Sequence, residues 1–160
     1  MASQITEGDE APDFTLRDEN GEAVTLSDRL EEGPVMLVFY PGDFTPACTR
    51  QMCSYRDRYE EFRELGIEII GISDDEADSH EKFRSKYELP FTLLADPDHQ
   101  VIEKYGGSGL LSAGGAHRAN FLIDAKGIVR YAHVEKVSLF YRKPEELLEA
   151  AERLVGDELT

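Results

Sequence analysis

Two cysteines, Cys48 and Cys53, are the residues of this 160-residue sequence best suited to nucleophilic or redox chemistry. Cys48 follows a loop rich in proline, glycine and aspartate. Thr45 and Pro46, just before it, are typical of a helix start, with threonine as N-cap and proline as first helical residue. Cys48 then lies third in the helix, beside unpaired backbone N–H groups and the positive end of the helix dipole. Both effects favour the thiolate, so we expect a lowered Cys48 pKa in an accessible, electropositive place.

The second cysteine lies five residues further along the same predicted helix. On an intact helix the two Cα atoms would be roughly 8.6 Å apart, with side-chain directions diverging by about 140°. A disulfide needs Cα atoms within about 7 Å, so Cys48 and Cys53 can bond only if the first turns of the helix unwind. The pair is therefore either a redox couple linked to a local conformational change or two inert buried thiols, and the spacing leaves both open.

Other site chemistry has weaker support in the sequence. Two cysteines are too few for a secreted disulfide scaffold. The four histidines, at positions 80, 99, 117 and 133, are scattered and do not combine with the cysteines at zinc-site spacings. The glycine-rich segment 106–115 lacks the G-x-G-x-x-G pattern and follows a predicted helix, so it does not predict a phosphate-binding loop.

The predicted strands and helices alternate along the chain. Residues 34–40 form a continuous apolar run, which is typical of a central strand buried on both faces and leads directly into the cysteine loop. Further strands are predicted at residues 14–16, 24–26, 67–72, 91–95, 121–124 and 128–134. Helices are predicted from residue 46 to about 65, through residue 87 after a cap at Ser73 or Asp74, at 98–105, and at 145–155 after Pro144.

This order predicts an α/β fold. Strands that alternate with helices imply parallel pairing, whereas the late hairpin at residues 121–134 implies antiparallel pairing. The expected architecture is a mixed central sheet with helices on both faces and an added N-terminal β-hairpin, compatible with a thioredoxin-like layout. No repeat or linker divides the sequence, so we expect residues 1–160 to form a single domain.

Composition and charge exclude several classes of partner. The 41% hydrophobic content is typical of a globular protein, and no apolar run approaches the roughly 20 residues that a membrane helix needs. With 17 basic and 33 acidic residues the formal net charge is −16, which repels nucleic acid and anionic membranes. The polar, acidic N-terminus lacks a secretory pattern, so we expect a cytoplasmic protein.

The loop residues resemble a known family. Pro41, Thr45 and Cys48 stand in the P-x-x-x-T-x-x-C spacing of the peroxiredoxins, and residues 39–49 resemble their peroxidatic loop. The likeness continues at residues 8–14 and 91–96, at Arg118 and at residues 121–124, so it spans most of the chain. A second cysteine five positions on is similar to the subgroup called bacterioferritin comigratory protein or peroxiredoxin Q.

The resemblance implies a role for each matching residue. Cys48 matches the peroxidatic cysteine, whose thiolate attacks a peroxide oxygen and becomes a sulfenic acid. Thr45 and Arg118 match the groups that support the peroxide and the thiolate, and Pro41 matches the proline that shields the pocket. Cys53 matches the resolving cysteine, which forms an intrachain disulfide that thioredoxin or a similar dithiol protein reduces. Hydrogen peroxide and small organic hydroperoxides are the implied substrates, and no metal, flavin or haem is implied.

Three other functions are compatible with the same residues. A thiol–disulfide reductase usually needs a C-x-x-C pair, which this sequence lacks. A redox-sensing or binding module would use the disulfide only as a switch. A one-cysteine peroxidase would leave Cys53 as a spectator.

Some positions depart from the family pattern or are expected to be structural. Gln51 stands where the subgroup commonly has glutamate, and Ala47 stands where glycine is frequent. Residues 135–141 look less like the subgroup, which leaves monomer and homodimer both open. We expect Tyr40 to be a wall residue at the strand end and His117 to be structural or solvent-facing. Arg118 taken alone could be a surface ion-pairing residue.

Overall fold

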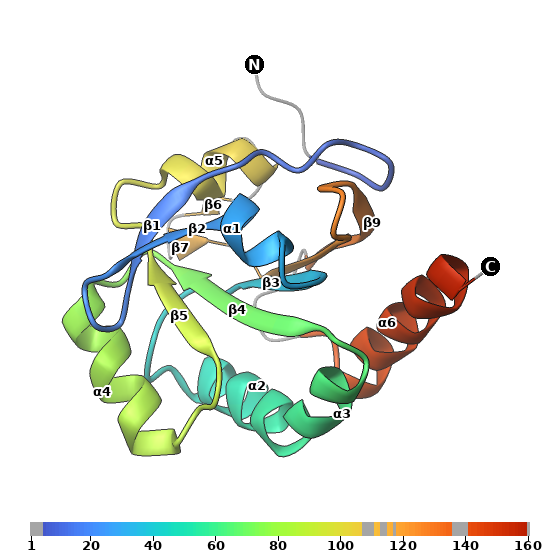
Figure 1. Cartoon of the computed structure of the whole chain (residues 1–160). Coiled ribbons are helices and arrows are strands. Elements are labelled where there is room, and N and C mark those ends of the chain that lie inside the picture. The colour runs from blue at the N-terminus through green and yellow to red at the C-terminus, as the bar shows by residue number, and fades with distance from the viewer. Residues whose placement is uncertain (1–4, 107–110, 113–114, 117, 136–140, 160) are drawn as a thin grey trace.

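The computed structural model describes residues 5–106, 111–112, 115–116, 118–135 and 141–159. Within these ranges, seven strands form one sheet in the order β2-β1-β5-β4-β3-β8-β9 (Figure 1). Their bounds are Thr15–Asp18 (β1), Ala23–Thr25 (β2), Val35–Phe39 (β3), Glu68–Ser73 (β4), Thr92–Ala95 (β5), Ala119–Ile123 (β8) and Val129–Val134 (β9). Strands β3, β4 and β5 are parallel, and the other pairings in the sheet are antiparallel. The predicted mixed sheet and N-terminal hairpin are confirmed.

Helices cover both faces of the sheet (Figure 1). Helices α1 (Leu26–Leu30) and α5 (Gln100–Gly106) pack on one face, and α2 (Pro46–Asp57), α3 (Tyr59–Glu64), α4 (Ala77–Tyr87) and α6 (Pro144–Leu159) pack on the other. Strand β3 lies between the two layers and is fully buried along its length. Its side chains alternate between the two hydrophobic clusters, which explains why its sequence is apolar without a break.

Several predicted boundaries were wrong. The second strand of the N-terminal hairpin ends at Thr25, because Leu26 begins the short helix α1, which was not predicted. The predicted cap of α4 at Ser73 or Asp74 is also wrong. The N-cap is Glu76, while the Ser73 hydroxyl donates to Asp75 at 2.7 Å. Helix α6 continues to Leu159, four residues beyond the predicted end.

The charged helix predicted over residues 46–65 is two helices. Arg58 has φ −114° and ψ 10°, which ends α2 at Asp57 and lets α3 begin at Tyr59. In the glycine-rich segment, a two-residue ladder joins β6 (Leu111–Ser112) to β7 (Gly115–Ala116), and residues 107–110 and 113–114 lie outside the described part. Among the described helices, none combines the length and the apolar character needed to cross a membrane.

The parallel strands bring two loops together at one edge of the sheet. β3 and β4 are neighbours in parallel register, so the segment after Phe39 and the segment after Ser73 leave from their carboxyl ends side by side. The first of these segments leads into α2 and the second leads into α4. In α/β sheets this edge is where ligands bind.

Gly71, in the middle of β4, is a close-packing point beneath α2. A Cβ atom there would lie 2.8 Å from Leu93 Cδ2, 3.2 Å from Met52 Cε and 3.3 Å from Tyr40 Cε1. All three neighbours are fully buried, so Gly71→Ala is expected to lower the free energy of unfolding by about 1–3 kcal/mol through overpacking.

Chemical denaturation measures this effect. Gly156→Ala in α6 is the matched control, because no atom lies within 4 Å of its new Cβ and alanine favours a helix by up to about 1 kcal/mol. An unfolding midpoint for Gly71→Ala equal to or above that of the unchanged protein would contradict the packing argument.

Candidate active site

Thr45 caps α2 as the sequence predicts. It has extended backbone angles, φ −69° and ψ 146°, and Pro46 is the first helical residue. The Thr45 hydroxyl accepts a hydrogen bond from the Cys48 backbone N–H at 3.4 Å and donates to the Gly42 carbonyl at 3.3 Å. The cap therefore joins the loop after β3 to the turn that carries Cys48.

Arg118 contacts Cys48 from the start of the neighbouring strand β8. It immediately precedes β8, which pairs with β3, and its side chain lies on the α2 face. Arg118 Nη1 donates to Cys48 Sγ at 3.0 Å, and Arg118 is only 3% exposed. The interpretation of Arg118 as a surface residue is therefore wrong. Arg118 therefore places a permanently charged donor directly at the sulfur, beside the N-terminus of α2.

The expectation that Cys48 is accessible was wrong for this conformation. Cys48 is fully buried, because its side chain points inward with Met52 and Tyr55, four and seven residues further along α2. Thr45 and Phe44 are exposed just outside it. The helix therefore presents its capping residues to solvent and its sulfur to Arg118.

Gln51, singled out in the sequence only as a departure from the family pattern that affects the hydrogen bonds of Arg118, belongs to the site. It lies one helical turn after Cys48, is fully buried, and accepts from the same Arg118 Nη1 at 2.7 Å. Its Nε2 donates to the Tyr55 hydroxyl at 3.1 Å, and that hydroxyl donates to the Arg142 carbonyl at 2.6 Å. Burial raises the pKa of Tyr55, so its hydroxyl keeps its proton. The signal in the sequence is the spacing of Cys48, Gln51 and Tyr55 on one helix face.

Cys53 lies on the same continuous helix as Cys48, and both thiols are free. Cys53 is partly exposed, and desolvation is the main cause that raises its pKa. Because both residues are helical, they keep the helical spacing at which a disulfide between them cannot form. The two cysteines are not brought together here.

Pro41 and Tyr40 form the start of the loop. Pro41 is half-buried, and Tyr40 is fully buried with its hydroxyl donating to Asp43 Oδ1 at 2.7 Å. Burial and the Asp43 charge raise the pKa of Tyr40 well above its usual value, which makes it a poor proton donor. This agrees with the expectation of a wall residue. His117 and residues 136–140 lie outside the described part of the chain.

One group in the described part of the chain has the spacing of metal ligands. Asp43, Asp75 and His80 place one ligand atom each within 4.8 Å of one another. Every one of these side chains already has hydrogen-bond partners within the protein.

Comparison with known proteins decides the family. Residues 7–132 match the AhpC/TSA family. The chain belongs to the AhpC/TSA family. Within it, this chain is a peroxiredoxin of the bacterioferritin comigratory protein and peroxiredoxin Q type, which confirms the resemblance.

Similar proteins include plant and microbial peroxiredoxins. The chain is 44% identical over 133 residues to chloroplastic peroxiredoxin Q of Oryza sativa subsp. japonica, covering 83% of this chain and 61% of that protein. It therefore spans about three fifths of the length of that curated relative.

Two solved structures support the thioredoxin-like fold of the family. Peroxidoxin BcpB from Mycobacterium tuberculosis is 30% identical with a TM-score of 0.83, over 96% of this chain and 98% of that one. Reduced 2-Cys peroxiredoxin of Plasmodium vivax is 25% identical with a TM-score of 0.85, over 98% of this chain and 100% of that one.

Proposed function

We propose that this peroxiredoxin is a thiol-dependent peroxidase that reduces hydrogen peroxide and small organic hydroperoxides. The observation that carries the proposal is the hydrogen bond from Arg118 Nη1 to Cys48 Sγ at the capped N-terminus of α2. A permanently charged donor at the sulfur can stabilise both the thiolate and the negative charge that develops on oxygen.

The proposed first step is attack of the Cys48 thiolate on one peroxide oxygen. The sulfur–oxygen bond forms as the oxygen–oxygen bond breaks, so sulfur is oxidised to the sulfenic acid. The other oxygen leaves with the electron pair as hydroxide or alkoxide and takes up a proton to become water or an alcohol. Thr45 and Arg118 would orient the peroxide and stabilise the leaving charge, and Pro41 would help to keep water out.

In the proposed second step, the Cys53 sulfur attacks the Cys48 sulfenic acid. A disulfide forms and water leaves, after the first turns of α2 unwind. Thioredoxin or a similar dithiol protein then reduces the disulfide by thiol–disulfide exchange and is itself oxidised.

Three further properties remain predictions. Cell fractionation would test the cytoplasmic location, and limited proteolysis would test the single-domain organisation. Sedimentation would distinguish a monomer from a homodimer.

Intact mass spectrometry after one equivalent of hydrogen peroxide tests the function on fully reduced protein. A loss of about 2 Da within seconds, mapped to a Cys48–Cys53 bond, is the expected result. A gain of about 16 or 32 Da on Cys48 would keep the peroxidase and remove Cys53 from the cycle. An unchanged mass would contradict the peroxidase, and oxidation without turnover on a dithiol reductant would favour the redox sensor.

Replacement of Arg118 tests the observation directly. Arg118→Met is expected to lower the second-order rate constant for Cys48 oxidation by about 10²–10³-fold, because a donor to the developing charge is lost. Arg118→Lys should recover part of the rate, since the charge remains without the planar geometry. Stopped-flow kinetics measures both. Arg130→Met is the control, because Arg130 pairs with Asp124 and Asp157 instead, and a rate for Arg118→Met equal to that of this control would refute the role.

A further inference from the structure

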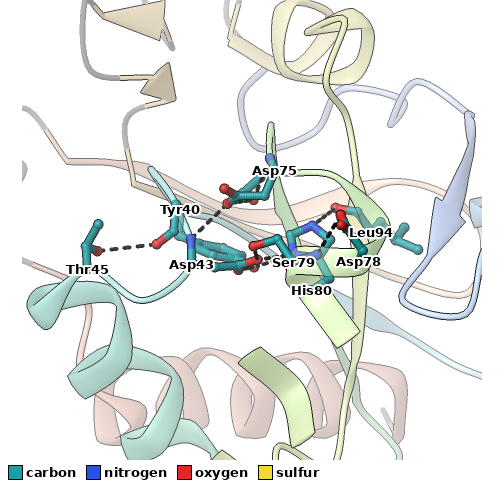
Figure 2. Close-up of polar contacts among 10 residues, drawn as sticks. Tyr40, Asp43, Thr45, Asp75, Asp78, Ser79, His80 and Leu94 are labelled. Carbon is teal, nitrogen blue, oxygen red and sulfur yellow. Dashed lines mark hydrogen bonds and ion pairs between the residues drawn. The ribbon is translucent and has the colours of Figure 1, made fainter. Parts of the chain in front are cut away.

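A buried polar cluster lies beside the cysteine loop and has no place in the reaction above. It forms where the loop after β3 meets the first turn of α4, and Figure 2 shows its side chains converging there. At its centre Asp43 Oδ2 and His80 Nδ1 are 2.7 Å apart, and the two side chains are 1% and 0% exposed. Buried ionisable groups are costly unless they are paired, so this contact needs an explanation.

Both ring nitrogens of His80 have a hydrogen-bond partner. Its Nε2 lies 2.9 Å from the Leu94 carbonyl oxygen, which can only accept, so Nε2 carries a hydrogen. Its Nδ1 faces Asp43, whose carboxylate also accepts the Tyr40 hydroxyl at Oδ1 and the Ser79 hydroxyl at Oδ2, at 2.7 and 2.8 Å. The hydrogen bond between Asp43 Oδ2 and His80 Nδ1 holds one proton, so both ring nitrogens of this buried histidine have a partner.

The backbone of Asp43 is held as firmly as its side chain. Its N–H donates to Asp75 Oδ2 at 2.8 Å, and the same oxygen accepts from the Ser73 hydroxyl at 2.7 Å. Asp43 is thus fixed to the segment after β4 and to α4 at once.

Asp43 lies two residues before the cap of α2. The residue between them, Phe44, has φ +65°, a left-handed conformation that a bulky side chain rarely adopts. Such a conformation persists only where the surrounding structure holds it in place. Fixing Asp43 on one side of Phe44 places Thr45 on the other, where it caps the turn that carries Cys48.

We propose that the buried, hydrogen-bonded Asp43–His80 pair positions Cys48 by anchoring the loop that ends in the Thr45 cap. The effect on peroxide reduction rests on the proposed function, whereas the anchoring itself does not. Both residues are positioning residues, because they act through Thr45 and the start of α2. A metal ion on Asp43, Asp75 and His80 is the competing explanation, and it would have to displace the proton on His80 Nδ1.

Nitrogen NMR of the His80 ring in the unchanged protein at pH 7 is the first test. His80 Nδ1 is expected to share a hydrogen-bonded proton with Asp43, and this signal is expected to be lost in Asp43→Asn. A His80 Nδ1 without a hydrogen-bonded proton in the unchanged protein would overturn the proposal. A ring spectrum altered by added Zn²⁺ and restored by chelator would also overturn it, in favour of a metal site.

Hydrogen exchange and kinetics on Asp43→Asn and His80→Gln form the second test. Exchange at the Cys48 and Thr49 amides is expected to become faster, and Cys48 oxidation by peroxide about 10–100-fold slower, because small misplacements of reacting groups are costly. His99→Gln is the matched control, since it removes the partly exposed His99–Asp74 pair. Exchange and rates equal to this control would overturn the positioning role.

The two hypotheses fail in different ways. If the unchanged protein does not react with peroxide, the proposed function fails, and the ring spectrum and amide exchange still decide the anchoring. If the unchanged protein reacts and the Asp43 and His80 variants match the His99 control, only the anchoring fails. Should either variant not fold, the ring spectrum of the unchanged protein still supports or overturns the Asp43–His80 hydrogen bond.

Discussion

Peroxide consumption is expected to stop completely in Cys48→Ser. A serine hydroxyl is un-ionised at neutral pH and is a far weaker nucleophile than a thiolate, so Arg118 would have no anion to stabilise. Serine is close to cysteine in size and Cys48 makes its backbone contact to Thr45 through N–H, so the fold is expected to persist. Continuous measurement of hydrogen peroxide with a dithiol reductant gives the activity, and thermal unfolding checks the fold.

The control for this loss is Cys53→Ser, which keeps Cys48 and its Arg118 contact. It should still react with the first equivalent of peroxide, whereas Cys48→Ser should react with none. Peroxide consumption by Cys48→Ser at the unchanged rate, with Cys53 alone oxidised, would assign the nucleophile to Cys53 instead.

Cys53→Ser is expected to complete one oxidation and then lose steady turnover. Without a second thiol the Cys48 sulfenic acid cannot become a disulfide, so further peroxide would drive it to the sulfinic acid. Intact mass should show a gain of about 16 Da and then about 32 Da, instead of the loss of about 2 Da expected for the unchanged chain. Unchanged turnover with a protein dithiol would support the one-cysteine mechanism.

Much of the fold could be predicted because local patterns and tertiary packing agree. The apolar run at residues 34–40 reads as a doubly buried strand, and β3 has both faces covered. The break at Arg58 could not be predicted, because the sequence there has no glycine or proline and remains charged and helix-favouring. The N-cap of α4 is Glu76 instead of the predicted Ser73 or Asp74, because Ser73 and Asp75 hold the cysteine loop.

The site likewise divides into features set by neighbouring residues and features set by contacts between distant parts of the chain. Thr45 and Cys48 follow from rules about one helix start, so their arrangement was predictable from neighbouring residues. Arg118 lies 70 residues from Cys48, and only the family resemblance pointed to it. Gln51, Asp43 and His80 were not predicted as site residues, because a buried polar side chain cannot be recognised until its partners are brought to it by the sheet.

The break between α2 and α3 at Arg58 limits how far the structural change needed for a Cys48–Cys53 bond extends. Arg58 binds Glu61 of α3 and, at 2.7 Å, Glu145 of α6, so the residue after α2 is tied to the neighbouring helices. Opening the first turns of α2 disrupts a few helical hydrogen bonds, each worth about 0.5–1.5 kcal/mol net, without extending the change into α3. Each redox cycle would then need only local unfolding at the start of one twelve-residue helix, a motion of microseconds to seconds, while the rest of the layer stays folded.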